Sequence, residues 1–188
     1  MASAELPKSR FIHFPKTGGW WCCYAMIDAG IPIQQASTDI RGGHAGHYFG
    51  DPEKPLFGFV RHPYTWYQSL FQYLQDIDWV FHPLARSETL EEFVQKVRNY
   101  RTTLLPMSDW VDQLFGFGVA SIGRYETLPA DLVRILTELG EEFDVKKITA
   151  MSHTYINPSL VWEQRTPAAE QLIRETDNHI FDRFGYAP

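Results

Sequence analysis

The sequence predicts an α/β fold in which a parallel β-sheet carries helices on both faces. Three short apolar runs, at 10–14, 56–61 and 119–126, have the length and content of buried strands, and a helix-like segment follows each of them. Strands that alternate with helices imply right-handed crossovers, which make the strands parallel and place helices on both faces of the sheet. A chain of 188 residues is long enough to build one such domain around a sizeable core.

The composition is that of an ordinary globular protein. Hydrophobic residues make up 44% and charged residues 21% of the chain, and the formal net charge is -6. Because the sequence has no block of lysine and arginine, we do not expect a nucleic-acid partner. The first residues lack the apolar core of a signal peptide, and no apolar run could span a bilayer, so we expect a cytoplasmic protein. Nothing in the sequence indicates an oligomeric state.

The first half of the chain contains two strand-to-helix units. The strand at 10–14 leads into a helix that begins near residue 20 and stops at Gly30, a residue type that suits the end of a helix. Cys22 and Cys23 lie on this helix, and we expect both to be free and buried, because adjacent cysteines rarely bridge to each other. The second strand, at 56–61, is followed by a helix that begins at Pro63.

The second half of the chain is predicted to be mostly helical. Thr89 and Glu92 have the spacing of a capping box at a helix start. Thr166 and Gly185 have the preferences of the first and last capping residues of a long C-terminal helix. The predicted elements of this half are helices over 89–100, 107–115, 129–140 and 166–185, the strand over 119–126, and a short last strand over 145–149.

The chain shows no internal repeat, low-complexity tract or long linker. We therefore predict a single domain over 1–188, with 1–9 as a flexible N-terminal segment. In a parallel α/β sheet, ligands bind beyond the carboxyl ends of the strands. The segments expected at that edge are 15–21, 61–69 and 124–126.

The segment Pro-Lys-Thr-Gly-Gly at 15–19 connects the first strand to the first helix. Glycines in such a turn expose backbone N–H groups, and the helix start adds a partial positive charge, so together they favour a phosphate. Lys16 would add a mobile cation. The order differs from the triphosphatase loop GxxxxGK[ST], in which the lysine and the metal-binding hydroxyl follow the glycines. The segment therefore indicates a P-loop-type turn that works without a metal.

A second constellation follows the second strand. Arg61 stands at the expected end of this strand, where a guanidinium can make a bidentate contact to phosphate. Ser69 lies eight residues further on, in the helix that begins at Pro63. Arg61 and Ser69 could share one phosphate if the helix returns alongside the strand end.

The motifs together resemble the sulfotransferases that use 3′-phosphoadenosine 5′-phosphosulfate (PAPS), in the branch whose first motif reads PKTGGTS. FIHFPKTGG resembles the 5′-phosphosulfate loop of this family, and FVRHPYTWYQSLF resembles its 3′-phosphate motif VRxPxxRxxSxY. IGRYETLPADLVRILTELG, INPS and IFDRFGY resemble later parts of the family. The resemblance extends from Arg10 to Tyr186, and the motifs stand in the family's order.

The resemblance implies a P-loop-type α/β fold and transfer of a sulfuryl group from PAPS to an acceptor, with 3′-phosphoadenosine 5′-phosphate (PAP) as the product and no metal required. By analogy Lys16 would stabilise the leaving phosphate. Arg61 and Ser69 would hold the 3′-phosphate, and Tyr125 would approach the adenine. The residues expected to cradle the 5′-phosphosulfate are Thr17, Gly18, Gly19, Trp20 and Trp21.

Trp20 and Trp21 depart from the family pattern, which has Thr-Ser at these positions. Hydroxyl contacts to the 5′-phosphate are lost there, although an indole N–H could donate a hydrogen bond or a ring could stack on the adenine. We expect at least one of the two rings to pack into the core. A closed loop would make the protein an inactive nucleotide- or carbohydrate-binding relative, and a P-loop small-molecule kinase is a further, less favoured alternative.

Transfer to a hydroxyl usually needs a general base, and histidine suits neutral pH. Of the seven histidines, His44 and His47 lie among glycines ahead of the second strand, in a loop where the resembled branch can place a histidine that faces the acceptor. His44 is our first candidate for the base and His47 the second. By analogy with the same branch, the acceptor is expected to be a carbohydrate or small-molecule hydroxyl.

Overall fold

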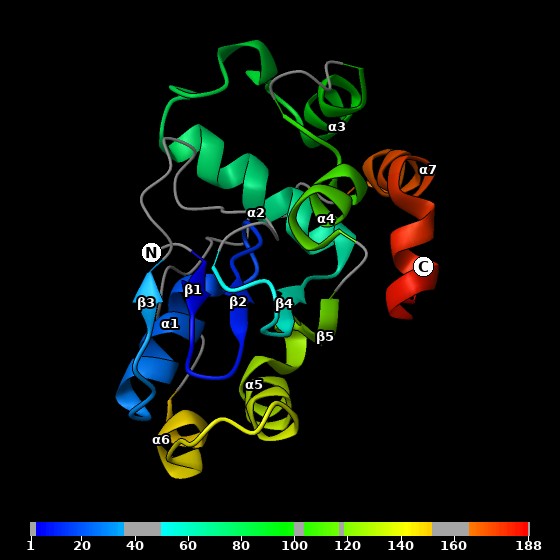
Figure 1. The fold of residues 1–188 in the computed structure, drawn as a ribbon. Helices are drawn as coiled ribbons and strands as arrows, with labels where there is room; N and C mark the ends of the chain where they lie inside the picture. The colour runs from blue at the N-terminus through cyan, green and yellow to red at the C-terminus, as the bar shows by residue number, and fades with distance from the viewer. Residues whose placement is uncertain (1–2, 36–49, 100–103, 117–118, 152–165, 188) are drawn as a thin grey trace. The chain divides into compact units, whose positions relative to one another are not determined.

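The computed structural model describes residues 3–35, 50–99, 104–116, 119–151 and 166–187 (Figure 1). The chain forms two compact units, each built from two separate stretches of sequence. The first unit comprises Met1–Arg61 and Val111–Pro158, and the second comprises His62–Trp110 and Ser159–Pro188. No helix within the described ranges has the length and apolar character needed to cross a membrane.

The first unit is built on a mixed β-sheet. Within the described residues its five strands run in the order β3-β1-β2-β4-β5. β2 pairs in parallel with β4 and β4 with β5, whereas β1 pairs antiparallel with both β2 and β3. The prediction of an α/β fold is therefore confirmed, but the wholly parallel sheet is corrected to a parallel centre with an antiparallel edge. The strands are β1 (Ala4–Glu5), β2 (Arg10–Ile12), β3 (Gln34–Gln35), β4 (Leu56–Val60) and β5 (Val119–Arg124).

The antiparallel edge comes from the N-terminal residues. We expected 1–9 to be a flexible segment, whereas Ala4–Glu5 forms β1 and is paired on both sides. Ala4 and Leu6 are almost fully buried, and Glu5 accepts a hydrogen bond from Lys54 Nζ at 2.7 Å. Burial of these two apolar side chains stabilises the ordered form of the N-terminal segment.

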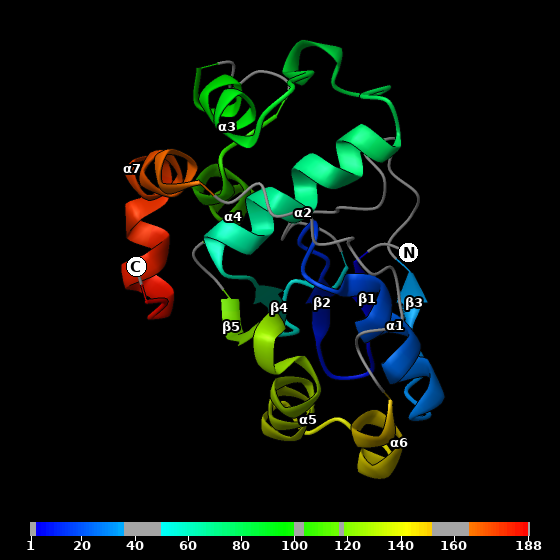
Figure 2. The same cartoon turned by 180° about the vertical axis from the view of Figure 1, so that it is seen from behind.

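Helices cover the sheet, and one face carries the main core. Phe11, Phe57 and Phe59 of the strands are buried against helix residues that include Trp21 and Leu132. Figure 2 shows α1 on this face. On the other face, a Cβ on Gly58 would lie 2.3 Å from Phe115 at the end of α4, so the ring fits only against a glycine. The helices that contribute are α1 (Gly19–Asp28), α4 (Met107–Phe115), α5 (Leu128–Glu138) and α6 (Val145–Ala150).

The predicted last strand over 145–149 is wrong, because Val145–Ala150 is helix α6. The Asp144 carboxylate accepts a hydrogen bond from the backbone N–H of Lys146, which caps the helix start. Ile148 is buried in the core, whereas Val145 is largely exposed. A strand would bury alternate residues, whereas this segment buries Ile148 and exposes both Lys146 and Ala150.

The second unit is helical in its described part. Thr89 accepts from the Glu92 N–H at 3.2 Å and Thr166 accepts from the Ala169 N–H at 3.1 Å, so both predicted N-caps are confirmed. Gly185 ends α7 with a φ of 61°, also as predicted. Its elements are α2 (Pro63–Asp76), the 3₁₀ turn η1 (Pro83–Ala85), α3 (Leu90–Asn99), the first residues of α4, and α7 (Pro167–Phe184).

A buried carboxylate joins three helices of the second unit. Asp177 interrupts α7 with non-helical backbone angles and is fully buried. Its carboxylate accepts from the Tyr67 hydroxyl of α2 at 2.6 Å and from the Met107 and Ser108 N–H groups at 3.3 and 2.9 Å. Because these two N–H groups open α4, the negative charge lies at a helix N-terminus, where it is stabilised. Burial, followed by the charge of Asp177, raises the pKa of Tyr67.

Candidate nucleotide-binding site

The candidate site begins in the loop between β2 and α1. The Thr17 side chain is buried, and its hydroxyl donates a hydrogen bond to the Phe14 carbonyl at 2.8 Å. Gly18 takes the left-handed conformation, with φ 77°, and accepts the first helical hydrogen bond from Cys22 at 3.0 Å. As a glycine, Gly18 has no side chain that could cap the helix. The first N–H groups of α1, which lack partners within the helix, therefore open at the carboxyl end of β2.

His13 and Gly19 fix the place where α1 begins. A Cβ on Gly19 would lie 1.8 Å from Cδ2 of the buried His13 ring. The His13 N–H donates to the Ser3 hydroxyl at 3.0 Å, which connects this strand residue to the N-terminal edge. Only a glycine at position 19 allows the helix to approach the strand this closely. Packing against His13 therefore explains the second glycine of the motif.

Lys16 has an unusual backbone conformation. Its φ of 63° lies in the left-handed region, which costs a residue with a Cβ about 1–2 kcal/mol. Such a conformation persists only where its surroundings over-determine it. The Arg61 guanidinium donates from Nη1 to the Lys16 carbonyl at 3.3 Å. A hydrogen bond from a charged donor contributes about 1.5–3 kcal/mol, which is enough to offset the cost.

Tyr125 completes the cluster from the end of β5. The Arg61 guanidinium carbon lies 4.2 Å from the centroid of the Tyr125 ring, in a cation–π contact. A Cβ on Gly18 would be 3.3 Å from the same ring, so the ring also packs against the loop. In the sheet, Val60 of β4 is paired with Arg124 of β5, which places Arg61 and Tyr125 at adjacent strand ends. Parts of all three segments expected at this edge therefore meet there, through Lys16, Arg61 and Tyr125.

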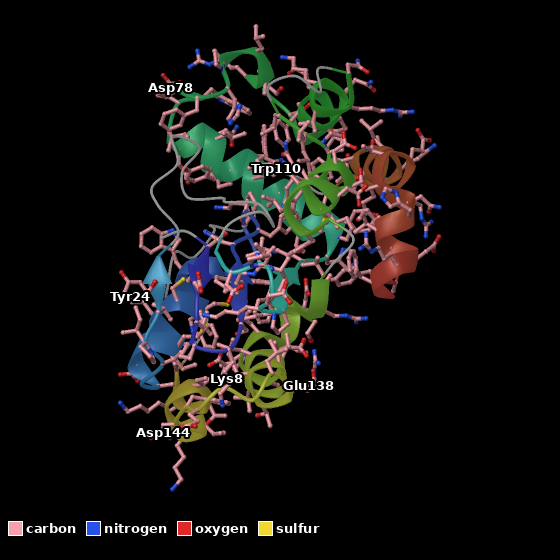
Figure 3. The ribbon with its side chains drawn as sticks, in the orientation of Figure 1. Lys8, Tyr24, Asp78, Trp110, Glu138 and Asp144 are labelled. Atoms are coloured by element: carbon pink, nitrogen blue, oxygen red, sulfur yellow. The ribbon has the colours of Figure 1, made fainter. Side chains whose placement is uncertain are left out.

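The two tryptophans of the loop have different environments. Trp21 is 1% exposed and belongs to the core, as we expected for at least one of them. Trp20 is 44% exposed, and its ring lies 6.1 Å from that of Tyr24 with an angle of 31° between the planes. Tyr24, labelled in Figure 3, is similarly exposed on the same helix. Of the two tryptophans, Trp20 is therefore the one that solvent or a ligand can reach.

For three of the predicted site residues, a place in this cluster stays a prediction. Ser69 is buried on α2 and belongs to the second unit, so its pairing with Arg61 stays a prediction. His44 and His47 lie outside the described residues, and the choice of a general base is untested. Among the described residues there is no group of three or more His, Cys, Asp or Glu side chains that could hold a metal ion.

Sequence reasoning missed the contacts that build the site. It placed Arg61 and Tyr125 at the carboxyl ends of strands, but gave no sign that the guanidinium contacts the Lys16 carbonyl. The closeness of His13 to Gly19 was also missed, although a glycine at the start of a helix is a signal for close approach. Cys22 and Cys23 were predicted correctly as free and buried, and burial raises the pKa of both thiols.

Comparisons with protein-family models, with curated proteins and with solved structures found no match to this chain. The function therefore rests on the residues of the site and on the motifs of the sequence.

Proposed function

We propose that the protein is a sulfotransferase that moves a sulfuryl group from PAPS to an acceptor hydroxyl of a carbohydrate or small molecule. The observation that carries this proposal is the meeting of Lys16, Arg61 and Tyr125 around the Gly18–Gly19 turn at the carboxyl ends of parallel strands. The Arg61 guanidinium and the N–H groups of a helix start without a side-chain cap favour an anion, and Lys16 would add a second cation. An aromatic ring in the same cluster suits a nucleotide, which carries both phosphate and a base.

Each residue has a defined part in this proposal. The N–H groups at the start of α1 bind the 5′-phosphate, and Lys16 neutralises the charge that develops on the leaving phosphate during in-line transfer. Arg61 binds the 3′-phosphate together with Ser69, and Tyr125 contacts the adenine. His44, or else His47, accepts the proton of the acceptor hydroxyl. A transferring sulfuryl group carries less negative charge than a phosphoryl group, so the chemistry proceeds without a divalent metal.

The test is calorimetric titration with PAP, the 3′-phosphorylated product, with ATP and Mg²⁺ as the comparison. We expect PAP to bind in the absence of metal and ATP with Mg²⁺ to bind far more weakly. Arg61→Ala should reduce the affinity for PAP at least about tenfold, because it removes a charge-assisted contact. The same substitution should reduce the affinity for adenosine 5′-monophosphate, which lacks the 3′-phosphate, less than it reduces the affinity for PAP.

Arg124→Ala is the matched control for this titration. Arg124 is an exposed arginine of the neighbouring strand, where it is paired with Val60, and its backbone N–H donates to the Asp131 carboxylate at 2.8 Å. Its removal should leave the affinity for PAP unchanged. If Arg61→Ala bound PAP as tightly as the wild-type protein, the assignment of the 3′-phosphate motif would be wrong.

One observation favours a second candidate, a nucleotide-binding relative without catalysis. The Thr17 hydroxyl is buried and donates to Phe14, and indole rings occupy the positions at which the resembled family has hydroxyls. This candidate predicts PAP binding without sulfuryl transfer to any acceptor. A kinase would instead require Mg²⁺ and bind ATP in preference to PAP.

A further inference from the structure

Arg61 contacts the first unit through both its guanidinium N–H and its cationic face, without any ligand. Its Nη1 donates to the carbonyl of Lys16 at 3.3 Å, and its guanidinium lies on the Tyr125 ring at 4.2 Å. The first contact acts on the backbone of the residue that we propose to be catalytic. The second restricts the guanidinium to the position from which the first can be made.

We infer that Arg61 is a positioning residue for Lys16: held by the Tyr125 ring, it fixes the left-handed backbone of Lys16. This inference rests on the proposed function for the role of Lys16, and it goes beyond the expected contact between Arg61 and the 3′-phosphate. It assigns to Arg61 an effect on the phosphosulfate loop that exists before any nucleotide binds.

The backbone of the loop needs support at two nearby positions. Lys16 has a φ of 63°, a region that residues with a Cβ rarely adopt. The residue precedes the buried Thr17 and the left-handed Gly18, so two left-handed residues lie within three positions of the chain. Tyr125 packs on Gly18 and beneath Arg61, so one ring supports the loop at both positions. Loss of either Arg61 or the ring should let residue 16 leave the left-handed region.

A double-mutant cycle on thermal stability tests the inference without any ligand. In the wild-type background, Lys16→Gly should raise the Tm by about 2–4 °C, because glycine adopts a positive φ without strain. In the Arg61→Ala background the same substitution should give no rise, since residue 16 is then free to relax. Equal shifts of the Tm in the two backgrounds would overturn the inference.

Three further variants distinguish the expected effect from a nonspecific loss of structure. Tyr125→Ala removes the ring and should abolish the rise in the same way as Arg61→Ala, whereas Tyr125→Phe keeps the ring face and should preserve it. Arg124→Ala, the control arginine of the neighbouring strand, should also preserve the rise. A rise that survives Tyr125→Ala would show that the ring does not hold Arg61 in place and would overturn the inference as stated.

The functional readout is the binding of adenosine 5′-phosphosulfate, which has the loop ligand but lacks the 3′-phosphate. Arg61→Ala should weaken this binding about tenfold through the loop alone. Equal affinities for the mutant and the wild-type protein would confine Arg61 to the 3′-phosphate and overturn the positioning role. If the wild-type protein bound neither PAP nor adenosine 5′-phosphosulfate, the proposed function would fail, and the unequal Tm shifts would still establish the effect of Arg61 on Lys16.

Discussion

At the scale of single residues, Lys16 gives the sharpest prediction. Lys16→Ala should lower sulfuryl transfer at least about a hundredfold, because a positioned charge that acts on the leaving group contributes mainly in the transition state. The measurement is transfer of labelled sulfate from PAPS to a panel of sugars and phenols. PAP affinity should fall much less than turnover, and the thermal transition should remain cooperative.

The control for this substitution is Lys8→Ala. Lys8 precedes β2, at the opposite end of the strand from the loop, and Figure 3 labels it near Glu138. Its Nζ donates to the Gly140 carbonyl, and its side chain is half exposed. Lys8→Ala should therefore leave transfer unchanged. Full turnover in Lys16→Ala would exclude a catalytic role for Lys16.

The paired cysteines give a prediction that does not depend on the function. Burial raises the pKa of Cys23 to about 12 and that of Cys22 in the same direction. At pH 8 the reactive thiolate of Cys23 should then be on the order of 10⁻⁴ of the total, so iodoacetamide should alkylate the native protein far more slowly than the urea-unfolded chain. Equal labelling rates in the native and unfolded protein would contradict this burial.

The same shift predicts how stability depends on pH. The folded pKa of Cys23 lies above the unfolded value of about 8.5, so the neutral thiol is favoured in the folded state. Its contribution to stability is complete below pH ~8 and is lost as the pH rises toward 12. Urea titrations at pH 8 and 10 measure this loss, and Cys23→Ala should reduce the difference between them.

Motif reasoning identified the residues of the loop but not their environments. Trp20 and Trp21 are neighbours at a helix start, and the sequence expected at least one of them in the core without saying which. The helix rotates adjacent side chains by about 100°, so one ring enters the core and the other is exposed. Which ring is buried depends on how α1 packs against Phe11 and Phe57, and these contacts are not encoded locally.

At the scale of elements, the start of α1 depends on the contact between Gly19 and His13. Gly19→Ala should destabilise the protein by about 1–3 kcal/mol, because the added methyl group overlaps the buried His13 ring. Chemical denaturation measures the loss. His13→Ala should remove most of this effect when the two substitutions are combined. Additive losses in the double variant would mean that Gly19 is required for a reason other than the ring.

The parallel strands and the long helices were predicted from the sequence, whereas the two-residue strands and the shortest α-helix were not. The three parallel strands and the long helices carry enough periodicity and capping residues to be recognised in the sequence. The two-residue strands β1 and β3 and the six-residue helix α6 do not. Their conformation follows from their partners, such as the pairing of Ala4 with Phe11 and Gln35, which local sequence does not record.

At the scale of the whole molecule, the acidic balance sets how a nucleotide can bind. A net charge of -6 gives no general attraction for an anion, so under the proposed function Lys16, Arg61 and the helix start would have to attract the nucleotide locally. The single sulfotransferase-like domain over 1–188 stays a prediction, and the chain divides into two compact units. Ser69 and Arg61 belong to different units, so binding of a ligand by both would link them.

Stabilisation of the folded protein by PAP is the last prediction. A ligand that binds only the folded protein, present at a hundredfold excess over its Kd, stabilises it by about 2.7 kcal/mol. For a chain of this size, PAP should then raise the Tm by about 5–10 °C. Adenosine 5′-monophosphate at the same concentration should give a much smaller rise, and Arg61→Ala should abolish most of the difference between the two nucleotides. Because Ser69 is proposed to bind the 3′-phosphate together with Arg61, Ser69→Ala should also reduce the rise in Tm with PAP. If PAP stabilised the Ser69→Ala protein as fully as the wild type, the 3′-phosphate would be held without this hydroxyl.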